Sequence, residues 1–226
     1  MISDRYVKML AAMLNGSLTS LQVFFLTLLF SVPLALPVAV GRMSRNRILS
    51  GAVNVFLLVI RGTPLMLQLL VVYFGPGIFI RWLMSLGYDV SFRWNRFAAA
   101  IIALSVNYAA YFAEIYRGGI ESVPVGQHEA AKVLGYTPCQ TFFTVILPQV
   151  VKRIVPAMGN EVITLVKDTA LVSVIGVSEL LMVAKERQSA MFSFFPLFIA
   201  GVFYFVMNWG VSFVFSRIEK KLSYYS

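Results

Sequence analysis

The chain has 226 residues, of which 59% are hydrophobic and 13% are charged, and its mean hydropathy is +0.80. Ordinary soluble domains carry about 25% charged residues, so this composition excludes a soluble globular enzyme. One cysteine and one histidine exclude an internal disulfide and a Cys/His metal cluster. The net charge of +9 comes mostly from Lys and Arg residues between apolar runs, as in an integral membrane protein.

Apolar runs predict an all-α chain with about five transmembrane helices, because a helix crosses the hydrocarbon core with about 20 apolar residues. We expect these spans at about 17–40, 50–73, 97–117, 154–165 and 194–216. The second span should end before the turn residues Gly75-Pro76-Gly77. The fourth is the weakest, since it is short, carries Glu161 and is followed by Lys167 and Asp168.

The distribution of positive charge predicts the orientation, because Lys and Arg in short loops favour the cytoplasmic side. With the N-terminus outside, the inner segments hold more Lys and Arg than the outer ones. Asp4, Arg5 and Lys8 precede an apolar run that is too long for a signal peptide, so we expect the first span to be retained. Without repeats or linkers, residues 1–226 are expected to form a single transmembrane domain.

The longest inner segment, about 118–153, is expected to contain a short helix. Pro124 suits its start, residues 127–134 are helix formers, and Gly135 stands where a helix should end. The i, i+3 and i+4 spacing of Ala130, Ala131 and Leu134 predicts a shared small-residue face. Such a helix would either fit a groove of a cytoplasmic partner or rest on lipid headgroups, and the residues alone favour neither.

Glu129-Ala130-Ala131, Gly135 and Val145-Ile146-Leu147-Pro148 together resemble the EAA loop of ABC importer permeases. Further blocks are similar to the polar amino-acid (histidine/glutamine/arginine-type) permeases of the type I importers, at 61–65, 113–120, 145–149 and 167–173. The resemblance runs from about residue 18 to residue 222. Two departures are mild: Ala170 stands where the family often has Ser, and Val150 where it often has Ala.

The resemblance implies the MetI-like fold and a coupling helix that docks on a cytoplasmic ATP-binding subunit. The residues that it assigns to this contact are Gln127, Glu129, Ala130, Ala131, Leu134 and Gly135. The chain has no G-x-x-x-x-G-K-[ST] phosphate loop, so we expect ATP and Mg to be bound by the partner subunit, with no cofactor in this chain. The implied complex contains two ATP-binding subunits, a second permease copy as a homodimer or heterodimer, and an extracytoplasmic solute-binding protein.

Ionisable residues inside a span usually mark a pathway or a pair, and Glu161 and Asp168 are such residues. They are seven residues apart, so they share one face of a continuous helix and could receive an ammonium or guanidinium group. Alternatively, Asp168 pairs with Lys167 or Arg61, and Glu161 pairs with an arginine at the end of a span. The other candidate substrate contacts are Gln68, Asn107, Asn160 and Tyr111, whose amides and hydroxyls could equally tie helices together.

The proline in Arg61-Gly62-Thr63-Pro64 should disturb the second span, as a broken helix that lines the pathway or as a simple kink. Glu114 is expected to be structural, and the alanines between 98 and 113 suit close helix packing or a dimer seam.

The sequence therefore predicts a bacterial cytoplasmic-membrane permease subunit for polar amino acids, cationic ones first, with no enzyme activity of its own. The alternatives are glutamine or another neutral polar amino acid, an ion-coupled secondary transporter, and a membrane scaffold without transport.

Overall fold

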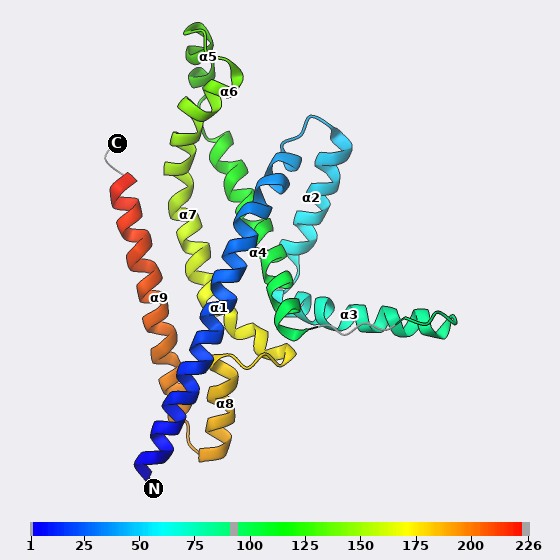
Figure 1. The fold of residues 1–226 in the computed structure, drawn as a ribbon. Coiled ribbons are helices and arrows are strands. Elements are labelled where there is room, and N and C mark those ends of the chain that lie inside the picture. Colours follow the sequence, from blue (N-terminus) through cyan, green and yellow to red (C-terminus); the bar gives the residue numbers. More distant parts are fainter. Residues whose placement is uncertain (1, 91–94, 223–226) are drawn as a thin grey trace.

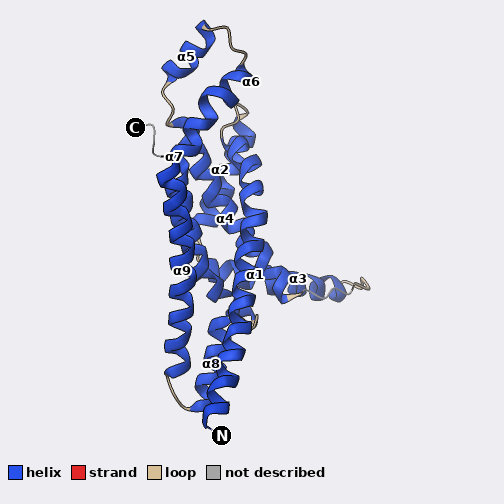
Figure 2. Ribbon diagram, turned by 60° about the vertical axis from the view of Figure 1, so that its left-hand side comes forward, coloured by secondary structure: helices blue, strands red, loops and turns tan. Residues whose placement is uncertain are grey.

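A computed structural model describes residues 2–90 and 95–222 of the chain, and every regular element in those ranges is helical (Figures 1 and 2). Five helical tracts are long and apolar enough to cross a membrane, as expected. The elements, in chain order, are α1 (Ile2–Arg42), α2 (Arg47–Gly62), α3 (Leu65–Ser85), α4 (Arg96–Glu121), α5 (Val125–Val133), α6 (Pro138–Gln140), the π-helical turn η1 (Thr141–Ile146), α7 (Leu147–Asp168), the 3-10 helix η2 (Thr169–Ile175), α8 (Leu180–Met191) and α9 (Phe195–Leu222).

Helices α1 and α4 form the centre of the bundle and make its most extensive contact. On α1 the buried side of this contact is a stripe of small residues at every fourth position, which allows close approach because such positions share one helix face. The stripe consists of Thr27, Ser31, Ala35 and Ala39. Most of the α4 alanines are buried within the chain, so they serve close helix packing. The alternative that they form a dimer seam is wrong for Ala99, Ala103, Ala109, Ala110 and Ala113.

The predicted second span is in fact two helices, α2 and α3, separated at Thr63 and Pro64. Thr63 has an extended backbone, with φ −115° and ψ 146°, so the interruption is a full break and not a kink. Figures 1 and 2 both show α3 leaving across the direction of the long helices. The expected end at Gly75-Pro76-Gly77 is wrong, because α3 continues through Pro76 to Ser85. An apolar segment keeps its backbone bonded by remaining helical, and Pro76 removes only one donor from the ladder.

The remaining spans follow the prediction more closely. Helix α4 contains the third, and α9 contains the fifth. The fourth is much longer than expected, because a helical tract from Pro138 to Ile175 continues on both sides of the apolar core. Thr137 begins this tract with a capping box in which its hydroxyl accepts from the Gln140 N–H, and Gly176, at φ +79°, ends it.

A buried carboxylate joins α1, α8 and α9 near the N-terminal end of the bundle. Glu179 is 0% exposed and caps α8 by accepting from the Leu181 and Met182 backbone N–H groups, both at 2.8 Å. The Tyr204 hydroxyl donates to it at 2.6 Å, and Ser20 donates at 3.4 Å. Burial raises the pKa of the Glu179 carboxyl above its usual range. No sequence signal identified this junction, because Glu179 lies between two spans and its partners are distant in sequence.

Candidate functional site

Five side chains from three helices converge in a polar cluster inside the bundle. We define this polar cluster as Arg61 from the end of α2, Tyr108 and Tyr111 from α4, and Glu161 and Asp168 from α7. Glu161 is close enough to Arg61 and Asp168 to interact with both electrostatically, and Tyr108 lies near both carboxylates. The cluster therefore combines two carboxylates, two phenol groups and one guanidinium between α2, α4 and α7.

Asp168 is held in place by a hydrogen bond. The Tyr108 hydroxyl, on a residue that is 2% exposed, donates to Asp168 Oδ2 at 2.7 Å. Lys167 also lies near enough to Asp168 to interact electrostatically. Glu161 and Asp168 both lie on the continuous helix α7, so the expected shared face is present, seven residues apart. Tyr108 was not predicted as a site residue, although it lies between Asn107 and Tyr111, which were.

Arg61 lies over the face of an aromatic ring in this cluster. Its guanidinium carbon is 5.4 Å from the centroid of the Tyr111 ring, within the range of a cation–π contact. A guanidinium between an aromatic face and a carboxylate has the partners that a cationic amino-acid side chain would use. Tyr111, which was predicted as a substrate contact, is therefore already engaged by a positive charge from the chain itself.

Gln68 and Asn107, two further predicted contacts, are paired with each other beside the helix break. Asn107 Nδ2 donates to Gln68 Oε1 at 3.0 Å. Gln68 Nε2 donates to the Ile60 carbonyl at 2.7 Å and to Thr63 Oγ1 at 2.9 Å. The carbonyls at the C-terminal end of a helix lack helical partners, and here side chains satisfy them. In this state the two amides tie α2, α3 and α4 together, which was the alternative reading.

Asn160 is not part of this arrangement. It is exposed on α7, and its backbone carbonyl accepts from Thr164 Oγ1 at 3.0 Å. Its neighbour Glu161 turns into the bundle because successive residues of a helix point about 100° apart. Within the described ranges, no group of three or more His, Cys, Asp and Glu side chains could hold a metal ion.

A second charged group, which we call the Glu114 cluster, lies on α4 further toward α5. Glu114 Oε2 is 2.8 Å from Arg117 Nη2 and 3.5 Å from Arg61 Nη1, and Glu114 Oε1 is 3.9 Å from Arg42 Nε. One carboxylate thus serves arginines from three helices, in agreement with the structural role expected for it. A cavity of about 420 Å³ adjoins it, lined by Asn54, Leu57, Leu58, Arg61, Gly62 and Glu114.

The short helix predicted within segment 118–153 is present as α5, with its expected ends. Pro124 precedes it, and Gly135 follows it at φ +79°. The N–H of Tyr136 donates to the Ala131 carbonyl and that of Gly135 to the Lys132 carbonyl, both at 3.0 Å. This is the Schellman arrangement, which needs a left-handed residue just past the helix, and Gly135 adopts that backbone without strain.

The exposed face of α5 differs in one residue from the prediction. Leu134 is 73% exposed and Ala130 is also exposed, but Ala131 is only 2% exposed. Helix α5 packs against η1, and Ala131 is the residue that it buries, so the expected common face of the three residues is wrong. Gln127 and Glu129 are exposed, with Gln127 Oε1 accepting from Gln149 Nε2 at 3.3 Å.

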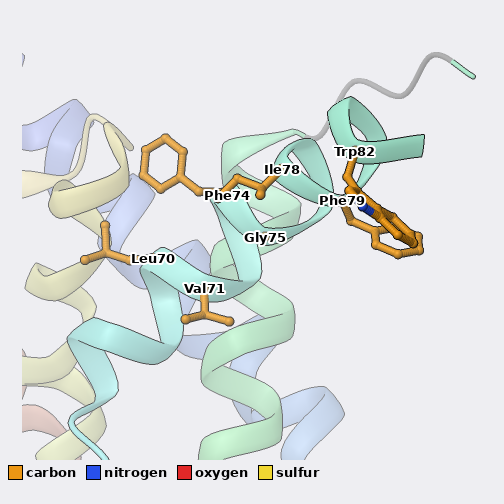
Figure 3. Close-up of a pocket in the computed structure, with 7 residues that line it drawn as sticks. All are labelled: Leu70, Val71, Phe74, Gly75, Ile78, Phe79 and Trp82. Atoms are coloured by element: carbon orange, nitrogen blue, oxygen red, sulfur yellow. The ribbon is translucent and has the colours of Figure 1, made fainter. Parts of the chain in front are cut away.

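Helix α3 carries an apolar surface that no other part of the described chain covers. Figure 3 shows its side chains along the helix, with the Phe79 and Trp82 rings next to each other at 5.6 Å. The first half of α3 is anchored to α4, where Arg96 Nε donates to the Tyr73 hydroxyl at 3.1 Å. The residues that line this surface are Leu70, Val71, Phe74, Gly75, Ile78, Phe79 and Trp82.

Comparison with known proteins adds a family and several relatives. Residues 10–224 match the model of the family described as "Binding-protein-dependent transport system inner membrane component". A nopaline transport system permease protein from Agrobacterium fabrum is 38% identical, covering 94% of this chain and 86% of its own. An arginine transport system permease protein from Bacillus subtilis is 36% identical, covering 92% and 91%. A putative glutamine transport system permease protein from Rickettsia felis is 33% identical over the same shares, 92% and 91%.

Solved structures resemble the fold over nearly its whole length. A crystal structure of an amino acid ABC transporter with histidines matches with a TM-score of 0.82 and 37% identity, covering 96% of both chains. An inward-facing MetNI methionine ABC transporter matches with a TM-score of 0.69 and 20% identity, covering 95% of this chain and 96% of that chain. The second likeness concerns the fold alone.

Proposed function

The chain belongs to the family of binding-protein-dependent transport system inner membrane components, and we propose that it is the permease subunit of an amino-acid ABC importer with a preference for cationic substrates. The expected multi-pass architecture and the absence of enzyme activity in the permease itself follow from this membership. The finer proposal concerns which amino acids pass and which residues bind them.

The observation that carries the cationic preference is the polar cluster. Two carboxylates, Glu161 and Asp168, share it with one guanidinium, so acidic groups outnumber basic groups among the residues that define the cluster. A cationic substrate beside these carboxylates would compensate their charge, at a place where an uncompensated charge is expensive. Tyr111 supplies an aromatic face for an ammonium or guanidinium group.

Relatives named for arginine and nopaline transport support this preference, whereas those named for glutamine transport support the alternative of a neutral polar substrate. A zwitterionic amino acid also carries an ammonium group, which the same carboxylates could accept. Asn107 and Gln68 are proposed to act on the α-amino or α-carboxylate groups only after their mutual hydrogen bond opens, since that pair is closed in this structure.

Transport is proposed to be driven through α5. In this proposal, two ATP-binding subunits, which hold ATP and Mg, dock on the exposed residues of α5 and on Gly135. Closure of those subunits pushes α5, and α4 and the α7 tract move with it because α5 connects them along the chain. A solute-binding protein delivers the amino acid at the opposite end of the bundle.

The orientation proposed is N-terminus outside and C-terminus inside. In Figure 1 the C-terminal end and α5 lie toward one end of the bundle, and the N-terminus and α8 lie toward the other. This arrangement supports the predicted orientation, which rests on the excess of Lys and Arg in the inner segments. A second permease copy, identical or not, completes the pathway, and together with lipid it would cover the apolar surface of α3.

The test replaces Glu161 with Gln in the reconstituted complex and measures equilibrium binding of radiolabelled arginine and glutamine. A charge-assisted hydrogen bond contributes about 1.5–3 kcal/mol, so arginine affinity should fall roughly 10- to 150-fold, with a smaller change for glutamine. Glu121→Gln is the matched control, because Glu121 pairs with Arg117 outside the polar cluster. Equal losses for both amino acids, or unchanged arginine binding, would remove the basis for cationic preference.

A further inference from the structure

Arg61 connects the polar cluster with the Glu114 cluster, and it is the residue that the two groups share. Its guanidinium lies over Tyr111 and near enough to Glu161 to act on it electrostatically, and its Nη1 is 3.5 Å from Glu114 Oε2. The side chain is 43% exposed, so it is not locked by packing. It also stands in the last turn of α2, directly before the break at Thr63 and Pro64.

We propose that Arg61 is a tethered cation that occupies the substrate position of the polar cluster in the substrate-free permease, and that an incoming cationic amino acid displaces it toward Glu114. This inference rests on the proposed function, since it assigns a competitor to the same site. It makes Arg61 a specificity-determining residue whose effect depends on the charge of the substrate.

The contacts of Arg61 are those that a substrate cation needs. An aromatic face and a carboxylate together bind a guanidinium or ammonium group. Two cations cannot share Tyr111 and Glu161 without repulsion, because like charges brought together in a water-poor site cost several kcal/mol. In the substrate-free protein, the Arg61 guanidinium therefore compensates the negative charge of the polar cluster. When a cationic substrate binds, the substrate takes over this role and Arg61 moves away.

Glu114 provides the place to which Arg61 retreats. Its carboxylate already contacts Arg42 and Arg117, and four oxygen lone-pair directions suffice for several guanidinium donors. Arg61 already reaches both Tyr111 and Glu114 from the end of α2, so moving it off Tyr111 and fully onto Glu114 needs side-chain rotation and no refolding. A neutral amino acid brings only its α-ammonium group to the cluster, so its binding depends less on where Arg61 lies than the binding of arginine does.

The displacement has opposite consequences for two substitutions. A site occupied by a competitor most of the time has its apparent affinity reduced by the vacant fraction, so removing the competitor tightens binding. Arg61→Gln should therefore strengthen arginine binding by about three- to tenfold if Arg61 fills the site for about 70–90% of the time. Glu114→Gln removes the retreat position and should weaken arginine binding by a similar factor.

The experiment measures equilibrium binding of radiolabelled arginine and glutamine to the reconstituted permease–ATPase complex, without the solute-binding protein. Arg42→Gln is the matched control, because it removes another partner of Glu114, 3.9 Å away, without touching Tyr111. The expected result is tighter arginine binding in Arg61→Gln, weaker arginine binding in Glu114→Gln, and a clearly smaller change of glutamine binding in both.

Three results would overturn the inference. If Arg61→Gln weakens arginine and glutamine equally, as Arg42→Gln would by loosening the helices, Arg61 has only a structural role. If Arg61→Gln leaves arginine binding unchanged, Arg61 does not occupy the site. If the unaltered complex binds neither amino acid, the proposed function fails, and this inference fails with it; the first two results leave the proposed function standing.

Discussion

Gln68 stabilises the break between α2 and α3, and replacing it with Leu tests this structural role. The substitution removes the donor to the Ile60 carbonyl at 2.7 Å, the donor to Thr63 Oγ1 at 2.9 Å, and the acceptor of the Asn107 amide at 3.0 Å. Leucine is similar in length and apolar, so lost hydrogen bonds and not lost volume should dominate the effect.

The expected loss of stability follows from the burial of the partners. Asn107 is 5% exposed, and leaving such a buried group unpaired costs about 1–3 kcal/mol. Interhelical hydrogen bonds in membranes contribute about 0.6 kcal/mol on average and about 1.7 kcal/mol at most. Together these values give a loss of about 2–4 kcal/mol for Gln68→Leu.

The assay is equilibrium unfolding of the purified permease in mixed micelles of mild detergent and SDS, arranged as a double-mutant cycle. Gln68→Leu combined with Asn107→Ala should be less damaging than the sum of the single changes, by about 0.6–1.7 kcal/mol, because the second change removes the orphaned amide. Asn160→Ala is the control partner, since Asn160 is exposed on α7 and should be additive with Gln68→Leu. Full additivity of Gln68→Leu with Asn107→Ala would refute a stabilising role of the Gln68–Asn107 hydrogen bond.

Three further predictions concern other parts of the fold. Gly135→Ala should reduce ATP-driven uptake while ATP hydrolysis continues, because a non-glycine residue at φ +79° costs about 1–2 kcal/mol and distorts the end of α5. Gly118→Ala is the control and should be tolerated, because its added Cβ also meets open space and its φ is not positive. Normal coupling of uptake to ATP hydrolysis in Gly135→Ala would contradict the docking role of α5. Because burial raises the pKa of Glu179, the folded state holds a proton more tightly than the unfolded state, so the free energy of unfolding should fall as pH rises through that raised pKa. Glu179→Gln should flatten this pH dependence when unfolding is measured across pH. Equal slopes of unfolding free energy against pH in both proteins would contradict the prediction. Ile78→Cys in a Cys139→Ser background should resist a membrane-impermeant maleimide, whereas Val125→Cys on α5 should react in inverted membranes; equal rates would place α3 in water.

Local signals predicted much of the fold, because they act over a few residues. Charge-free runs located α4 and α9, Pro64 located the break, and Pro124 with Gly135 located the ends of α5. Each of these signals concerns backbone geometry or the transfer of a charge into hydrocarbon, and neighbouring sequence determines both.

The features that the sequence did not predict depend on which elements meet. Pro76 looked like the end of a span, but the apolar residues after it keep α3 helical to Ser85. Ala131 was placed on an exposed face, yet η1 returns along the chain and covers it. Helical periodicity predicts which residues share a face of a helix, but not which other helix that face contacts. The sequence therefore left open whether Gln68 and Asn107 bind substrate or hold helices together, and the packing of α2, α3 and α4 shows them paired with each other.

Glu161 and Asp168 show the same difference between local spacing and tertiary packing. The shared face of Glu161 and Asp168 followed from their spacing on α7. Their actual environments did not, since Tyr108 is 60 residues away from Asp168 and Arg61 lies on a different helix from Glu161. A sequence shows which charges enter the membrane, and only the packing shows which of them meet.

The most direct test is ATP hydrolysis by this permease reconstituted with its ATP-binding subunits and a loaded solute-binding protein. The proteins would be supplied in turn with arginine, lysine, histidine, glutamine and glutamate. We expect cationic amino acids to stimulate hydrolysis most, glutamine less and glutamate least, with the arginine response lost in Glu161→Gln. Strongest stimulation by glutamate, or an arginine response that survives Glu161→Gln unchanged, would contradict a cationic site formed by the polar cluster.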